Sequence, residues 1–135
     1  MDAELIYKAQ TIQKEIEEMQ THAQLIDREL SELQQFKKDL VVLEKREEKG
    51  MLSSLGKGVF LKTEAVSKEL FVEVGAGIVV KKTSAQTQEV IEQQIKKISE
   101  ARLHTISKLE LYHQALRQII QTIQQEQQAH GKKEA

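Results

Sequence analysis

Hydrophobic residues in the first third of the chain recur at alternating steps of four and three positions. This is the heptad spacing of a helix that buries one narrow stripe against a partner helix. After Leu33 the stripe continues either to Lys37, in strict register, or to Phe36, from which Leu40 and Leu43 follow. A skipped residue of that kind changes the winding of a helix pair locally. The first stripe consists of Leu5, Ala9, Ile12, Ile16, Met19, Ala23, Ile26, Leu30 and Leu33.

The last third of the chain repeats the same alternation. The sequence contains no proline, so neither segment carries the residue that most strongly breaks a helix. We therefore expect helices over residues 1–49 and 84–131, the first ended by Gly50 and the second followed by a charged tail at residues 132–135. The second stripe consists of Ile91, Ile95, Ile98, Leu109, Tyr112, Leu116, Ile119 and Ile123.

An antiparallel pairing of the two stripes predicts which residues face each other, because facing residues have numbers with a nearly constant sum. A sum near 135 places the small Ala23 opposite the bulky Tyr112. The polar seam positions Thr105, Arg102 and Lys37 then face apolar residues, which lowers stability but can fix the register.

At the free ends of the pair, this register extends the first apolar stripe beyond the second. Ala9 would face Glu126, and Leu5 would face His130. Such unpaired side chains either fray or hold an apolar partner reversibly, since a narrow patch contributes only a few kcal/mol at about 25 cal/mol per Å². The candidate binding residues are Leu5, Ile6, Ala9, Ile12, Ile119, Ile120 and Ile123.

Residues 50–83 are rich in β-branched and aromatic side chains and are bounded by glycines. This composition predicts two β-hairpins with tight turns at Gly56/Gly58 and Gly75/Gly77, since glycine adopts positive φ without steric cost. Two hairpins cannot bury their apolar faces alone, so we expect this segment to assemble with other chains. The predicted oligomerisation residues are Val59, Phe60, Leu61, Leu70, Phe71, Val72, Val74, Ile78, Val79 and Val80.

Charge and chemistry argue against several classes of function. The formal net charge is −1 at pH 7, and the lysine pairs are scattered rather than gathered into the basic face that nucleic acids need. The absence of cysteine suits a reducing cytoplasm, and no apolar run is long enough to cross a bilayer. No acid, base and pocket assemble, and the histidines lack metal-ligand spacing. We therefore expect a soluble cytoplasmic protein that is not an enzyme and has no cofactor, metal, nucleic-acid or membrane partner.

The hairpin motifs resemble a known family. Leu-Gly-Lys-Gly-Val-Phe-Leu at residues 55–61 and Leu-Phe-Val-Glu-Val-Gly-Ala-Gly-Ile-Val-Val-Lys-Lys-Thr at residues 70–83, set between the two helical segments, are similar to the α-class subunit of prefoldin, particularly the archaeal type. The resemblance covers essentially all 135 residues. It implies one prefoldin-like domain of the α+β class, mainly α, in which a long antiparallel two-helix coiled coil is joined by two central β-hairpins that assemble into a shared β body.

The resemblance also implies a function. A prefoldin is an ATP-independent holdase of two α-class and four β-class subunits, whose coiled-coil tips bind unfolded polypeptides and deliver them to a group II chaperonin. The free-end residues then become candidate client-binding residues. The competing hypothesis is a structural or filament-forming coiled-coil oligomer that transfers no client.

Overall fold

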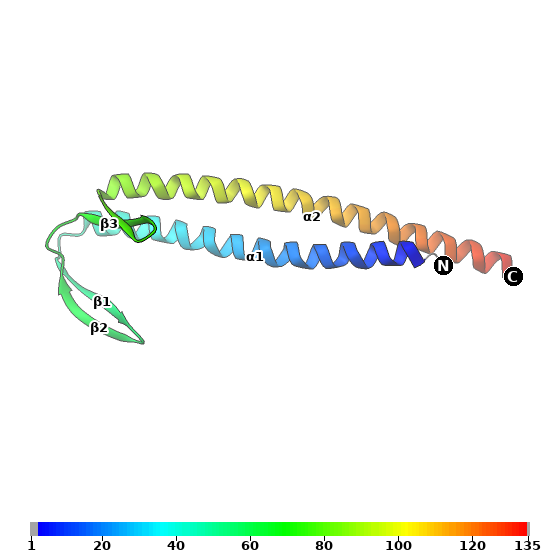
Figure 1. Ribbon diagram of the computed structural model, residues 1–135, viewed down its shortest axis with the longest axis horizontal. Helices are drawn as coiled ribbons and strands as arrows, with labels where there is room; N and C mark the ends of the chain where they lie inside the picture. The colour runs from blue at the N-terminus through cyan, green and yellow to red at the C-terminus, as the bar shows by residue number, and fades with distance from the viewer. Residues whose placement is uncertain (1–2, 135) are drawn as a thin grey trace. The chain divides into compact units, whose positions relative to one another are not determined.

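The computed structural model of the protein describes residues 3–134. Helix α1 spans Ala3–Lys45 and helix α2 spans Ser84–Glu134. Strands β1 (Gly50–Gly56), β2 (Val59–Glu64), β3 (Leu70–Gly75) and β4 (Ile78–Lys82) lie between them in the chain. The strands form two separate antiparallel sheets, β1 with β2 and β3 with β4 (Figure 1). The mainly helical α+β fold, with two hairpins between long helices, is therefore as predicted.

The chain divides into two compact units. Residues 1–30 and 97–135 form what we call the helix-end unit, and residues 31–96 form the hairpin unit. Within each unit, a stretch of α1 lies beside a stretch of α2 in antiparallel orientation (Figure 1). Each unit thus contains its own part of the predicted helix pair.

The predicted apolar seam forms the core of both units. Ile16 and Ile26 are buried in the helix-end unit, and Leu40 and Ile91 are buried in the hairpin unit. The other apolar seam positions in α1 and α2 are partly buried. Heptad spacing therefore identified the buried face of each helix correctly.

The seam of α1 passes through Lys37 rather than Phe36. Phe36 is 50% exposed, whereas Lys37 is partly buried and its ammonium pairs with the carboxylate of Glu92. The strict heptad register is therefore kept, because the lysine stem covers the seam while the charged end reaches an acid beside it.

Contacts between the helices give a different register from the predicted one. In the helix-end unit, Arg102 Nε donates to Asp27 Oδ1 over 2.5 Å. In the hairpin unit, Lys37 Nζ donates to Glu92 Oε2. The residue numbers of both pairs sum to 129, six below the predicted 135.

Glu44 accepts hydrogen bonds from Ser84 and Gln88. The residue numbers of these two pairs sum to 128 and 132, on either side of 129. The predicted sum is therefore wrong, and the sum of 129 in the helix-end unit places Ala23 near residue 106 instead of opposite Tyr112. The error has a physical cause. Two heptad stripes still match after one helix slides by one heptad, about two turns, so hydrophobicity alone does not select the register.

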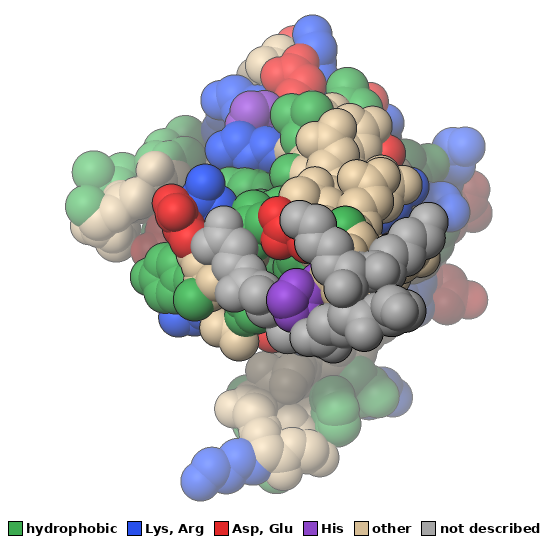
Figure 2. Space-filling view, turned by 90° about the vertical axis from the view of Figure 1, so that its right-hand side faces the viewer, with side chains coloured by type: hydrophobic (Ala, Val, Ile, Leu, Met, Phe, Trp, Pro, Cys, Tyr) green, Lys and Arg blue, Asp and Glu red, His purple; other side chains and the backbone are tan. Residues whose placement is uncertain are grey.

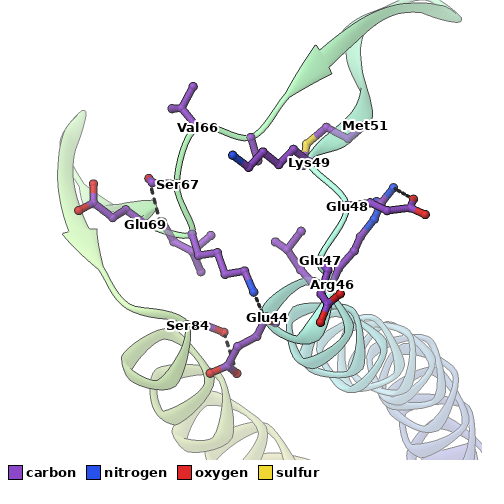
Figure 3. A pocket seen from close by; sticks show the side chains of 14 residues that line it. Glu44, Arg46, Glu47, Glu48, Lys49, Met51, Val66, Ser67, Glu69 and Ser84 are labelled. Carbon is purple, nitrogen blue, oxygen red and sulfur yellow. Dashed lines mark hydrogen bonds and ion pairs between the residues drawn. The ribbon is translucent and has the colours of Figure 1, made fainter.

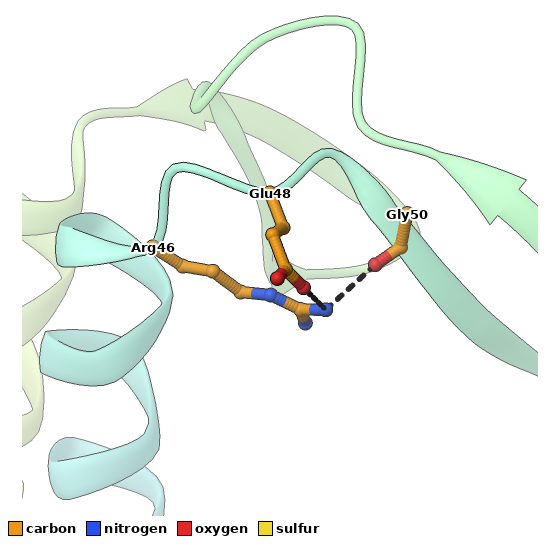
Figure 4. Close-up of polar contacts among 3 residues, drawn as sticks. All are labelled: Arg46, Glu48 and Gly50. Carbon is orange, nitrogen blue, oxygen red and sulfur yellow. Dashed lines mark hydrogen bonds and ion pairs between the residues drawn. The ribbon is translucent and has the colours of Figure 1, made fainter.

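Helix α1 ends at Lys45, earlier than the predicted end at residue 49. Gly50 does not cap the helix, because it is the first residue of β1 and pairs with Glu64. Arg46 Nη2 donates to the Gly50 carbonyl over 2.8 Å and lies 3.5 Å from Glu48 Oε2, which fixes the link between helix and strand (Figure 4). Acidic residues at 47 and 48 also disfavour extension of the helix, since its carboxyl end carries partial negative charge.

Helix α2 begins with a capping box, close to the predicted start. The Gln86 amide donates to Thr83 Oγ1 over 3.1 Å, and the Thr83 amide donates to Gln86 Oε1 over 3.0 Å. The helix continues through Gly131 to Glu134, so the expected end at residue 131 is corrected. Gly131 does not adopt the positive φ of a cap, and an exposed glycine inside a helix costs only about 1 kcal/mol. Residues 1–2 and 135, at the ends of the predicted segments, lie outside the described residues.

The two hairpin turns have the same construction. Lys57 and Gly58 connect β1 to β2 with φ of 52° and 79°, and Ala76 and Gly77 connect β3 to β4 with φ of 50° and 74°. Two successive positive φ values define a type I′ turn, whose twist matches that of the strands. A bulge precedes each turn, at Gly56 in the first hairpin and at Gly75 in the second. The predicted turn glycines therefore all occupy positions with positive φ.

Candidate functional site

An open groove of about 400 Å³ lies between the two helices of the helix-end unit. Its apolar lining comes from both helices, and polar side chains of α1 form its rim. The apolar lining residues are Ile6, Ala9, Leu116, Ile120 and Ile123, and the polar ones are Gln10, Gln13, Lys14 and Glu17. The groove therefore presents hydrocarbon with few charges.

The groove exists because apolar side chains flank the seam. Ile6 follows the seam residue Leu5, and Ile120 follows the seam residue Ile119. A side chain in that heptad position lies at the edge of the interface and is only partly covered by the partner helix. Ile120 accordingly remains 43% exposed.

The end of this unit carries several separate apolar groups. Figure 2 looks onto it and shows hydrophobic side chains in green between acidic and basic ones. The groove supplies one strip of apolar surface on this unit.

The structure brings together four of the seven predicted binding residues, Ile6, Ala9, Ile120 and Ile123, in the groove. The other three, Leu5, Ile12 and Ile119, are partly buried seam residues. With the sum of 129 found in this unit, residues 119 and 123 lie close to residues 10 and 6 of α1. The predicted overhang of an unmatched first stripe is therefore wrong, and the exposed apolar surface lies beside the seam instead.

Leu116 and the polar rim residues were not predicted to belong to the binding surface. Gln13 follows the seam residue Ile12, just as Ile6 follows Leu5. The heptad position directly after a seam residue was therefore the sequence feature that could have identified Gln13. The rim residues that were missed are Gln10, Gln13, Lys14 and Glu17.

The hairpins form the second candidate surface. Leu70 and Val72 are partly buried, whereas the other predicted oligomerisation residues are between 39% and 68% exposed. Each sheet has only two strands, so every strand also has one edge without a ladder partner in its sheet. Such edges and faces favour pairing with further strands. The exposed residues are Val59, Phe60, Leu61, Phe71, Val74, Ile78, Val79 and Val80.

A hollow of about 510 Å³ in the hairpin unit lies between the end of α1, the segment 65–70 and Ser84 (Figure 3). Lys68 Nζ donates to the Glu44 carbonyl, while Gln88 Nε2 donates to Glu44 Oε2 over 3.1 Å. Glu44 therefore joins both helices and the connection between the hairpins. The contacts within this hollow hold its own walls together.

Among the residues that the structure describes, no group of three or more His, Cys, Asp or Glu side chains could hold a metal ion. None of the helices in this described part has the length and hydropathy needed to cross a membrane. The two apolar surfaces are thus the features that a function can be built on.

Comparison with known proteins supplies the family. The sequence profile described as "Prefoldin subunit" matches residues 12–132. Among solved structures, the fold is similar to that in a cryo-EM structure of filamentous PFD from Methanocaldococcus jannaschii, with a TM-score of 0.75 and 20% sequence identity. The match covers 84% of this chain and 96% of that one. No curated protein matches the chain.

Proposed function

The chain belongs to the prefoldin family, and we propose that it is a subunit of an ATP-independent holdase that binds unfolded polypeptides in the groove of its helix-end unit. Family and fold support a chaperone-type subunit that assembles with other prefoldin subunits. The groove is the single observation that carries the proposal. It offers Ile6 and Ile120 from different helices on one accessible strip.

Binding of this kind needs no nucleotide. A client side chain that enters the groove removes apolar surface from water, and this burial is the driving force. Because the groove is narrow, one chain binds weakly. Several subunits acting together raise the overall affinity without any new contact, which keeps each contact reversible.

The double variant Ile6→Ser with Ile120→Ser tests this proposal. Complete burial of an isoleucine contributes about 1.5–3 kcal/mol. Ile120 is 43% exposed in the free chain and Ile6 is partly buried, so client binding gains about 1 kcal/mol from Ile120, less from Ile6, and about tenfold in affinity from both. We expect weaker suppression of client aggregation at limiting chaperone and without ATP. Full protection by the variant, at the wild-type oligomer size, would refute the groove as the client-binding site.

We further propose that the chain is an α-class subunit. The motif at residues 74–80 supports this assignment by its resemblance to the archaeal type. The expected assembly contains two α-class and four β-class subunits, works in the cytoplasm without catalysis, and passes its clients to a group II chaperonin. Mixing the chain with a β-class subunit and measuring the mass of the complex tests the assembly. Transfer of a labelled client to a chaperonin tests the delivery.

A second candidate function is a filament-forming structural oligomer. The similar fold of a PFD that is described as filamentous favours this alternative. A filament grows from this chain alone, whereas the closed hexamer requires a β-class partner. Light scattering of the purified chain as a function of concentration separates the two. Unlimited growth without client protection would support the structural role.

A further inference from the structure

We propose that the groove of the helix-end unit binds its client as an amphipathic α-helix of about three heptads, which packs as a third helix against α1 and α2. This inference rests on the proposed holdase function and adds the conformation of the bound segment. Three observations support it: the shape of the groove, the flank on which the groove lies, and the lack of free backbone hydrogen-bonding groups in its helical walls.

The groove lies on one flank of the helix pair, and the α1 side of this flank carries fewer charges than the α1 side of the opposite flank. The α1 residues that directly follow a seam position on this side are Ile6, Gln13, Gln20 and Asp27. The corresponding residues on the opposite flank, each directly before a seam position, are Lys8, Glu15, His22 and Glu29. On α1, the first flank is therefore the one that favours an apolar partner, because charged side chains on the other flank prefer water.

The same flank continues along α2 beyond the groove itself. Ile106 and His113 precede Ile120 by fourteen and seven residues, so they lie on the same side of the helix. Ile106 is 39% exposed, and His113 is partly buried. The strip of half-covered side chains on α2 therefore extends over two further heptads.

The ion pair between Asp27 and Arg102 bounds this strip at its inner end, because it crosses between the helices on the same flank. The distance from Ile6 to Asp27 is 21 residues, or roughly 31 Å at 1.5 Å per residue. A helix of three heptads has the same length. Each heptad position of such a helix recurs about every 10.5 Å, the same repeat as the flank positions of α1 and α2, whereas the same-face side chains of a strand recur about every 6.8 Å.

Backbone hydrogen bonding also favours a helical client. The walls of the groove are helices, whose own amides and carbonyls are paired along the helix. An extended segment buried there would depend on side chains such as Gln10 and Gln13 for its backbone groups, and unpaired buried groups are unfavourable. A helix satisfies its backbone internally and presents only side chains to the groove.

Three synthetic peptides of 21 residues and identical composition test the inference. The first carries apolar residues at heptad positions, the second in strict alternation, and the third has the heptad order with a central Pro in exchange for a terminal one. We expect the full-length, assembled chain to bind the first peptide at least tenfold more tightly than the other two. Bound peptide should gain helical circular dichroism. Ile106→Ser should weaken binding by about threefold, while Leu111→Ser, which removes a 64% exposed residue outside this flank, should not.

Equal affinity for the heptad and alternating peptides, or binding without gain of helicity, would overturn the helical client. The same holds if Leu111→Ser weakens binding as much as Ile106→Ser. These results leave the proposed holdase intact when the wild-type chain still prevents aggregation. If the wild-type chain does not suppress aggregation of any client, the proposed function itself has failed. Circular dichroism of each variant confirms that its helices are retained.

Discussion

Thr105 and Thr87 allow a sharp test of how the helix pair is stabilised. Each is 6% exposed. Thr105 occupies a seam position of α2, where the heptad favours an apolar side chain, and Thr87 lies beside the seam in the first turn of the helix. Thr87 Oγ1 donates to the Thr83 carbonyl over 2.9 Å. Valine has nearly the same shape as threonine, with a methyl group in place of the hydroxyl. Thr87→Val and Thr105→Val therefore make the same substitution, and only Thr87→Val removes this hydrogen bond.

The magnitudes follow from burial and hydrogen bonding. A buried methyl group contributes about 0.8 kcal/mol, so Thr105→Val should stabilise the helix-end unit by about 1 kcal/mol. In Thr87→Val the same gain is offset by a lost hydrogen bond of about 1 kcal/mol, so the free energy of unfolding should change by less than about 0.5 kcal/mol. Thermal unfolding at one fixed protein concentration should show a rise of about 4 °C for Thr105→Val alone. A rise for Thr87→Val with none for Thr105→Val would refute this account of the seam.

Three further predictions test the register, a turn and the assembly surface. Exchanging the charges in Asp27→Arg with Arg102→Asp should recover about 0.5 kcal/mol relative to the sum of the single variants in a double-mutant cycle, whereas no coupling would contradict the observed register. Ala76→Asn should raise hydrogen-exchange protection of the second hairpin, since alanine has φ of 50° there and asparagine tolerates this region better; lower protection would contradict the turn type. Val72→Asp with Val74→Asp should give a smaller, still helical species in size-exclusion chromatography, and an unchanged elution volume would argue against the hairpins as the assembly surface.

The elements of the fold could be predicted because their signals are local. Heptad spacing identified the seams, and the glycines at 56, 58, 75 and 77 identified the turns, since both depend on residues that are close in sequence. The end of α1 could not be located in this way. Gly50 has the residue type of a helix cap, but its pairing with Glu64 in the ladder decides its conformation.

The register and the exact surface of the candidate site required the structure. Seams of alternating three and four steps fit each other in more than one register, and the polar seam members were expected to face apolar residues. Arg102 instead turns sideways to Asp27, because a long charged side chain need not face its seam neighbour. The shift removes the expected overhang of Leu5 and Ala9, and the place where an apolar partner can bind becomes the groove beside the seam.

The two apolar surfaces of the chain differ in what their backbones offer. The hairpin strands have open edges, so a partner strand gains hydrogen bonds along its whole length in addition to apolar burial. The groove is walled by helices whose backbones are already paired, so a client gains burial alone. A contact of the first kind is suited to lasting assembly. The second, with an apolar lining of only five residues, is suited to repeated binding and release, which is what a holdase without a nucleotide cycle requires.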